Sequence, residues 1–204
     1  MLNSKIFENV RQARKQILVV TKYWDTKKTC EILWEAEEKY SDVFLALWEN
    51  RIENIIDKNI ERKKVHFIGN IQSQKIPEIV KYCSVIHSLQ SLKHATKIEN
   101  QWFPISAFIQ INLDENKQQW ISWDNLSYFL QACNGFKNVK IIGISGMWSA
   151  DISETRKRDE FKKLISLRDT YLPSWLISAG TSRDYQWALK QWIDVVRVGS
   201  AIIQ

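Results

Sequence analysis

Ile17-Leu18-Val19-Val20-Thr21-Lys22 is the stretch that decides the fold of this chain. Four apolar residues follow one another, and β-branched residues predominate, so both faces of the predicted strand should be buried, as in a parallel sheet. Lys22 ends the predicted strand, where parallel α/β folds place their chemistry. Burial would lower the pKa of its amine and free a lone pair for a Schiff base. On this stretch alone, an ordinary charged strand end is the simpler interpretation.

Strand-like and helix-like segments alternate along the rest of the chain. A short polar helix at 2–15 comes first. The predicted strands are 17–22, 43–47, 65–69, 85–89, 105–113, 139–144, 175–178 and 195–198. The helices after them are 27–39, 50–62, about 72–82, a short helix ending at 98, about 122–133, 151–169 and about 183–191. Asp25 or Thr26 can cap the helix that follows the first strand.

Eight strand-then-helix units in 204 residues predict an α/β fold, a single (β/α)8 TIM barrel with a short N-terminal helix. An open doubly wound sheet is the alternative. The chain has neither GxGxxG nor GxxxxGK[ST], which removes the usual nucleotide fingerprints of that alternative. With 45 % apolar residues, 6 Gly, 3 Pro and no flexible linker, residues 1–204 are expected to form one domain.

The net charge of +6 would suit an anionic partner. The basic residues are scattered, however, and the clusters at 61–64 and 156–158 are short and flanked by acids, which is typical of solvated helix faces. No nucleic-acid-binding motif accompanies them, so no nucleic-acid partner is expected. A basic nucleic-acid binder remains the third candidate function.

The scattered cysteines, Cys30, Cys83 and Cys133, predict reduced thiols and a cytoplasmic protein. We find no signal-peptide pattern and no run of 18 apolar residues, so no membrane partner is expected. The three histidines and Cys83 lack zinc-site spacing, and no metal is expected.

Two loops near the C-terminus have the composition of a phosphate site. Ser178-Ala179-Gly180-Thr181-Ser182 follows the seventh predicted strand, and Arg197-Val198-Gly199-Ser200 ends the eighth. Small residues, hydroxyl groups and free backbone amides can cradle an anion, and barrel enzymes often bind phosphate between these two loops. Together with a lysine on strand one, they favour a phosphate site over ordinary turns.

A strand-end lysine that faces a phosphate site indicates two chemistries. The lysine can hold pyridoxal 5′-phosphate as an internal aldimine. Alternatively, it can act as the Schiff-base residue of a class I aldolase-like barrel enzyme that takes a sugar phosphate.

The motifs of the chain resemble those of the pyridoxal phosphate homeostasis proteins, single-domain barrels similar to the N-terminal domain of alanine racemase. Val19-Val20-Thr21-Lys22 is similar to the lysine strand of that family, and Glu49-Asn50 to its Gly-Glu-Asn motif. The segment 66–75, HFIGNIQSQK, is similar to HFIGxLQxNK. Segments 178–184 and 196–202 resemble SMGMSxD and VRIGTAI.

The chain departs from the family pattern at a few positions. Trp48 stands where the family has the glycine of its Gly-Glu-Asn motif, and Arg51 where it has a tyrosine. Ala179 and Thr181 replace two methionines of the loop after strand seven. These differences concern the shape of the expected cofactor site.

The resemblance implies a role for each matching residue. Lys22 would form the aldimine, and Arg197 would point at the pyridine nitrogen or the phosphate rim. Asn50 and His66 would lie beside the ring, although His66 is as well explained as a core histidine. The phosphate would be surrounded by the two loops, through Ser178, Gly180, Thr181, Ser182, Gly199 and Ser200.

The function expected from these residues is cofactor binding in vitamin B6 homeostasis with little or no catalytic turnover, so no catalytic residue is assigned. Arg197 can only donate a hydrogen bond, so a ring nitrogen beside it would stay neutral and stabilise a carbanion poorly. A racemase would also need a second base from another domain. The expected partners are pyridoxal phosphate and cofactor-accepting apoenzymes, and the chain is taken as a monomer.

Overall fold

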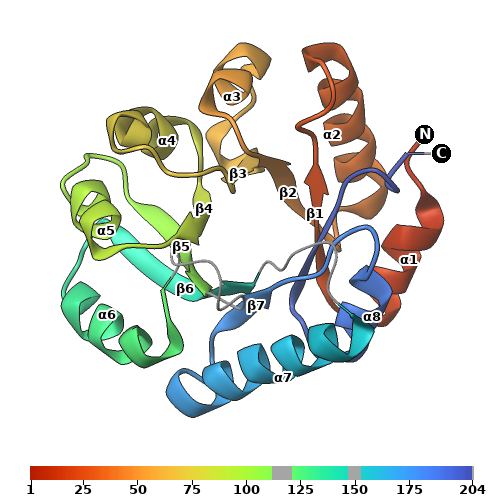
Figure 1. The fold of residues 1–204 in the computed structure, drawn as a ribbon. Coiled ribbons are helices and arrows are strands. Elements are labelled where there is room, and N and C mark those ends of the chain that lie inside the picture. The colour runs from red at the N-terminus through yellow and green to blue at the C-terminus, as the bar shows by residue number, and fades with distance from the viewer. Residues whose placement is uncertain (112–120, 147–152, 204) are drawn as a thin grey trace.

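The computed structural model describes residues 1–111, 121–146 and 153–203, and these form a closed parallel barrel. The strands follow one another around the barrel in chain order, from β1 to β8, and β8 pairs with β1 to close it. Helices surround the strands on the outside (Figure 1). The predicted (β/α)8 TIM barrel with a short N-terminal helix is therefore confirmed.

The elements alternate in the described residues as the hydrophobic pattern predicts. The strands are β1 Gln16–Val20, β2 Phe44–Glu49, β3 Val65–Phe67, β4 Val85–Leu89, β5 Ile105–Ile111, β6 Val139–Gly146, β7 Leu176–Ser178 and β8 Val195–Val198. The α-helices are α1 Ser4–Gln12, α2 Thr26–Tyr40, α3 Ile52–Lys58, α4 Ile76–Tyr82, α5 Leu92–Glu99, α6 Leu126–Cys133, α7 Glu154–Tyr171 and α8 Tyr185–Lys190. Short 3₁₀ turns lie at Arg62–Lys64, Ser73–Lys75 and Trp123–Asn125.

Strand β1 is buried on both faces, as its continuous apolar run predicts. Ile17 and Val19 belong to the large core between the barrel and its helices. Leu18 and Val20 belong to a second cluster inside the barrel, together with Trp48 from β2. Successive strand side chains point to opposite faces, so an uninterrupted apolar run supplies both cores at once.

Local signals explain where the two longest helices begin. The Asp25 carboxylate accepts a hydrogen bond from the Lys28 N–H at 2.7 Å, so Asp25 and not Thr26 caps α2. Ser153 caps α7 in the same way, accepting from the Arg156 N–H at 3.3 Å. The predicted start of this helix at 151–152 lies outside the described residues, as do the last two residues of the strand expected at 105–113.

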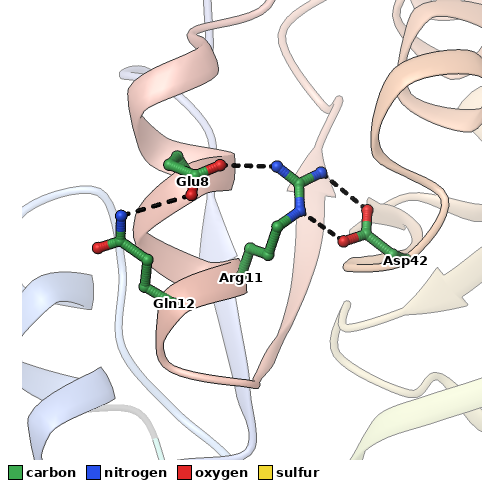
Figure 2. A network of polar contacts seen from close by, with 4 residues as sticks. All are labelled: Glu8, Arg11, Gln12 and Asp42. Atoms are coloured by element: carbon green, nitrogen blue, oxygen red, sulfur yellow. Dashed lines mark hydrogen bonds and ion pairs between the residues drawn. The ribbon is translucent and has the colours of Figure 1, made fainter.

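A surface ion-pair network ties α1 to the loop before β2 (Figure 2). Arg11 donates from Nε and Nη2 to the two carboxylate oxygens of Asp42, at 2.5 and 2.9 Å, and from Nη1 to Glu8 at 2.7 Å. The Arg11 guanidinium is the main reason that the pKa of Asp42 lies below its usual value. At the other end of α1, the Asn3 N–H donates to the Ile202 carbonyl at 2.8 Å, which brings the two termini together (Figure 1).

Strand β1 is shorter than predicted, and this matters for the site. It ends at Val20, so Lys22 lies two residues beyond it, in a turn in which the Trp24 N–H donates to the Thr21 carbonyl. Helix α3 is also shorter than predicted, because Asn59 adopts the left-handed conformation with φ 48° and ends it.

Two further findings bear on the sequence analysis. All three cysteines are free thiols. Within the described ranges, no helix has both the length and the apolar character required to cross a membrane.

Candidate functional site

A pocket of about 360 Å³ opens at the carboxyl ends of the barrel strands. Residues from β1, β2 and β8, from the loops after β1, β7 and β8, and from the first turn of α7 meet there, as the topology of a parallel barrel requires. Its described lining consists of Val20, Lys22, Tyr23, Trp48, Lys157, Thr181, Ser182, Arg183, Asp184, Arg197, Gly199 and Ser200. Six of the ten predicted site residues are in this set: Lys22, Thr181, Ser182, Arg197, Gly199 and Ser200.

Lys22 reaches the pocket from the turn after β1. Its side chain is half-buried, and its Nζ lies 4.8 Å from the centre of the Tyr23 ring. No carboxylate in the described parts of the chain forms an ion pair with it. The Lys22 amine can therefore approach a ligand in the pocket without first leaving an ion pair with a described carboxylate.

The two predicted phosphate loops lie against each other. The Gly199 N–H donates to Ser182 Oγ at 3.0 Å, which joins the loop after β7 to the loop after β8. The Asp184 carboxylate accepts from both the N–H and the hydroxyl of Thr181, at 2.6 and 3.0 Å, and this shapes the first loop. The pocket wall formed here carries hydroxyl and backbone N–H groups, the donors that a phosphate group requires.

Gly180 shapes the first loop without lining the pocket. Its φ is +89°, and a Cβ built on it would lie 2.7 Å from the Ala188 Cβ, so only glycine suits this position. Its carbonyl accepts from the Arg197 N–H at 3.2 Å and from Arg197 Nε at 3.4 Å. Gly180, a predicted site residue, therefore contacts Arg197 and does not line the pocket.

Arg197 is the buried charge at the floor of the pocket. Its side chain is 1 % exposed, donates from Nη2 to the Gly146 carbonyl at 2.8 Å, and lies 5.1 Å from the centre of the Trp48 ring. Burial lowers the pKa of Arg197 to about 10, so the guanidinium still carries its charge at neutral pH. Its Nη1 and the Trp48 Nε1 find no hydrogen-bond partner among the described residues. A buried cation with an unused donor is suited to an acceptor atom supplied by a ligand.

His66 and Ser178 lie inside the barrel instead of in the pocket lining. They are joined through His87, whose Nε2 is 3.0 Å from His66 Nδ1 and whose Nδ1 is 3.1 Å from Ser178 Oγ. His87 also stacks on Phe108, with the ring centres 4.2 Å apart. Burial lowers the pKa of His66 to about 3, and burial together with the charges of His66 and Arg197 lowers the pKa of His87. Both imidazoles are therefore neutral.

Asn50 is the fourth predicted residue outside the pocket lining. It is exposed, two residues before α3 begins. Its carbonyl oxygen lies only 2.0 Å from where a Cβ on Gly69 would be, so the backbone of these two loops is in close contact. The role of Asn50 beside a cofactor ring stays a prediction.

Several residues that line the pocket were not expected from the sequence. The basic cluster at 156–158 was expected on a solvated helix face, whereas Lys157 lies on the pocket rim beside Arg183. Trp48 was noted only as a departure from a family pattern, and Tyr23 was not among the expected site residues. The available signal for Lys157 was its position at the start of the helix that follows strand six. In a (β/α)8 barrel, the amino end of that helix lies at the face where the strands end.

Comparison with known proteins gives three findings, and no family model matches the chain. The chain is 28 % identical over 170 residues to a pyridoxal phosphate homeostasis protein from Synechocystis, covering 76 % of this chain and 78 % of that protein. The structure of PipY from Synechococcus elongatus with pyridoxal phosphate bound superposes with a TM-score of 0.77 at 19 % identity, covering 98 % of this chain and 100 % of PipY.

Alanine racemase from Corynebacterium glutamicum has the same barrel, with a TM-score of 0.68 at 13 % identity over 97 % of this chain and 60 % of the racemase. Below 25 % identity, the structural matches bear on the fold alone. By sequence, the chain is therefore similar to the pyridoxal phosphate homeostasis proteins, and by fold it is similar to PipY and to part of alanine racemase.

Proposed function

We propose that this chain binds pyridoxal 5′-phosphate through Lys22 and takes part in vitamin B6 homeostasis, with little or no catalytic turnover. The observation that carries the proposal is that a lysine amine, two phosphate-type loops and a buried guanidinium share one pocket. The names of the curated relatives and the bound cofactor in PipY support it. As partners we propose pyridoxal phosphate and cofactor-accepting apoenzymes, and we take the chain as a monomer.

The residues of the pocket fit such a cofactor. Ser182, Ser200 and the backbone N–H groups around them would hold the phosphate, and Lys157 and Arg183 add positive charge at the rim. Arg197, held by the carbonyls of Gly146 and Gly180, would donate to an acceptor on the ring side. Pyridoxal 5′-phosphate supplies an aldehyde, which condenses with a primary amine and releases one water molecule.

The same residues argue against efficient turnover. Arg197 is protonated at neutral pH and can only donate, so it cannot protonate a ring nitrogen in the way that a carboxylic acid would. Asp184 is the one carboxylate among the described lining residues, and it already accepts two hydrogen bonds from Thr181. The pocket is therefore built to hold a cofactor more than to activate it.

Titration of the purified chain with pyridoxal 5′-phosphate tests the proposal. We expect a visible absorption band that grows to one equivalent without any other substrate, because the amine and the phosphate loops are sufficient for capture. An aldolase-like enzyme would instead be trapped by borohydride only when a sugar phosphate is present. A chain that leaves the cofactor spectrum unchanged but is trapped with a sugar phosphate would overturn the proposal in favour of the aldolase.

The phosphate loops should contribute affinity without being needed for covalent capture. Replacing Ser182 and Ser200 by alanine removes two hydroxyl contacts, each worth roughly 1–3 kcal/mol toward a charged phosphate. We expect the dissociation constant for pyridoxal 5′-phosphate to rise by roughly one to three decades, with the visible band recovered at saturation. Replacing two exposed serines, Ser41 and Ser174, is the matched control. Equal affinity of the two double variants would place the phosphate elsewhere.

A further inference from the structure

A buried polar cluster lies behind the pocket, and the function proposed above assigns no role to it. It consists of Thr21, Glu49 and Lys58, which come from the end of β1, the end of β2 and the end of α3. Thr21, Glu49 and Lys58 are 0 %, 1 % and 6 % exposed, respectively. Glu49 follows Trp48, which lines the pocket, so the Glu49 side chain points to the opposite, outer side of the barrel wall.

The three side chains contact one another directly. Glu49 Oε1 forms an ion pair with Lys58 Nζ and also accepts a hydrogen bond from Thr21 Oγ1 at 2.7 Å. Lys58 Nζ donates in addition to the Thr21 backbone carbonyl at 2.9 Å. The ion pair therefore holds Thr21 through both its side chain and its main chain.

The remaining backbone contacts of Thr21 complete the arrangement. Its N–H donates to the Trp48 carbonyl at 3.1 Å, and its carbonyl accepts from the Trp24 N–H at 3.1 Å. Four hydrogen bonds thus converge on the residue immediately before Lys22. They fix the place where β1 ends and the turn that carries Lys22 begins.

The energetics argue that this cluster has a specific use. Removing two charges from water is unfavourable, and buried ion pairs often add little net stability compared with apolar residues of the same volume. The second carboxylate oxygen of Glu49 has no hydrogen-bond partner among the described residues, so desolvation of this acid is only partly compensated. A cluster that adds little stability can still select one backbone geometry.

We propose that Glu49 and Lys58 are positioning residues for Lys22, acting through Thr21. They hold the turn so that the Lys22 amine faces the pocket, and they touch no ligand themselves. The inference rests on the proposed function, because it concerns the approach of Lys22 to the cofactor aldehyde. A misplacement of about 1 Å at a reacting group can lower a rate by roughly a hundredfold, so a small shift of this turn is sufficient.

Two ligands separate positioning from general stability. Pyridoxal 5′-phosphate has the aldehyde that Lys22 attacks, whereas pyridoxine 5′-phosphate has a hydroxymethyl group there and binds without covalent capture. We expect Thr21→Val, which removes the hydroxyl at nearly equal volume, to slow covalent capture on the order of tenfold. The same variant should bind pyridoxine 5′-phosphate within about twofold of the wild type, because the phosphate loops are unchanged.

Further variants make the test specific. Thr21→Ser keeps the hydroxyl and should restore the wild-type capture rate. Lys58→Met should slow capture more than Thr21→Val, since it removes the ion pair and the bond to the Thr21 carbonyl together. Lys75→Met is the matched control. It breaks the partly exposed ion pair between Lys75 and Glu53, which also belongs to α3, and leaves Thr21, Glu49 and Lys58 unchanged. Thermal unfolding shows which variants fold. If Lys58→Met does not fold, the comparison of Thr21→Val with Thr21→Ser tests the inference.

Each outcome decides the matter. Slower capture with unchanged pyridoxine 5′-phosphate affinity, rescued by serine, supports the inference. Equal loss of both ligands would reduce the cluster to a purely structural role, and an unchanged capture rate in Thr21→Val would exclude positioning through the hydroxyl; either result overturns the inference alone. A wild-type chain that binds neither ligand would overturn the proposed function as well.

Discussion

Replacing Lys22 by alanine should abolish covalent capture of pyridoxal 5′-phosphate and with it the visible absorption band. Among the described residues, Lys22 is the lysine that reaches the pocket from the end of a barrel strand, beside the phosphate loops, while Lys157 reaches the rim from the start of α7. Non-covalent binding should persist at higher concentration, because Ser182 and Ser200 remain. We expect the loss of the band to be complete and not partial.

Borohydride reduction followed by peptide mapping checks this expectation. The pyridoxyl group should be found on Lys22 in the wild type and on no lysine in Lys22→Ala. Lys27→Ala, which alters an exposed lysine of α2 close in sequence, is the control and should keep the band. Labelling of Lys157 in the wild type would show that the wrong amine has been assigned.

Mild acid should destabilise the fold steeply because of the two histidines inside the barrel. The pKa of His66 is about 3 in the folded chain, and that of His87 is also well below its usual value, mainly through burial. In the unfolded chain both have a pKa of about 6.5. Between these limits the unfolded chain binds more protons than the folded one, so the free energy of unfolding falls as the pH falls.

The size of the effect follows from this difference in bound protons. Each histidine that is protonated only in the unfolded chain lowers the free energy of unfolding by about 1.4 kcal/mol per pH unit. The stabilisation by the neutral imidazoles is thus complete above pH 6.5 and is lost progressively towards about pH 3. Most carboxylates titrate near pH 4, so the interval from pH 6.5 to 5 isolates the histidines.

Urea unfolding at pH 7.0, 6.0 and 5.0 measures the slope. The free energy of unfolding of the wild type should fall from pH 7 to pH 5. In the double variant His66→Asn, His87→Asn this pH dependence should be weaker, whatever the stability of the variant at pH 7. Partial burial and the charges of Lys93 and Lys97 also lower the pKa of His94 on helix α5. His94→Gln is therefore the comparison variant and should flatten the dependence less than the two barrel substitutions, because His94 is only half-buried. A wild-type stability that is unchanged between pH 7 and pH 5 would mean that the buried histidines already carry protons in the folded chain.

The sequence by itself determined the barrel and the strand ends at which the pocket lies. The apolar run from Ile17 to Val20 predicts burial on both faces of the strand. Successive strand side chains point to opposite faces, and this alternation can be read from the local sequence. Lys22, Ser182 and Gly199 could be assigned to one site in advance. In a parallel barrel all strands end on the same face, so residues that follow strands one, seven and eight must meet.

The direction in which each side chain points was decided only by the tertiary structure. His66 and Ser178 stand next to cofactor-type motifs in the chain, yet they face the barrel interior and meet there through His87. A shift of one residue in strand register reverses the face of every side chain, and nothing local to HFIG sets that register. Likewise, the carbonyl of Gly180 accepts from Arg197 in a loop where φ is +89°, and the local sequence does not identify this partner.

The cluster behind Lys22 was also decided by the tertiary structure alone. Thr21, Glu49 and Lys58 are separated by 28 and 9 positions along the chain. In the sequence, Lys58 lies within the helix predicted at 50–62 and Glu49 follows the strand predicted at 43–47, and nothing there marks them as an ion pair. They become a buried ion pair with a hydroxyl partner only when α3 packs over the ends of β1 and β2, since burial depends on neighbours that the local sequence does not contain.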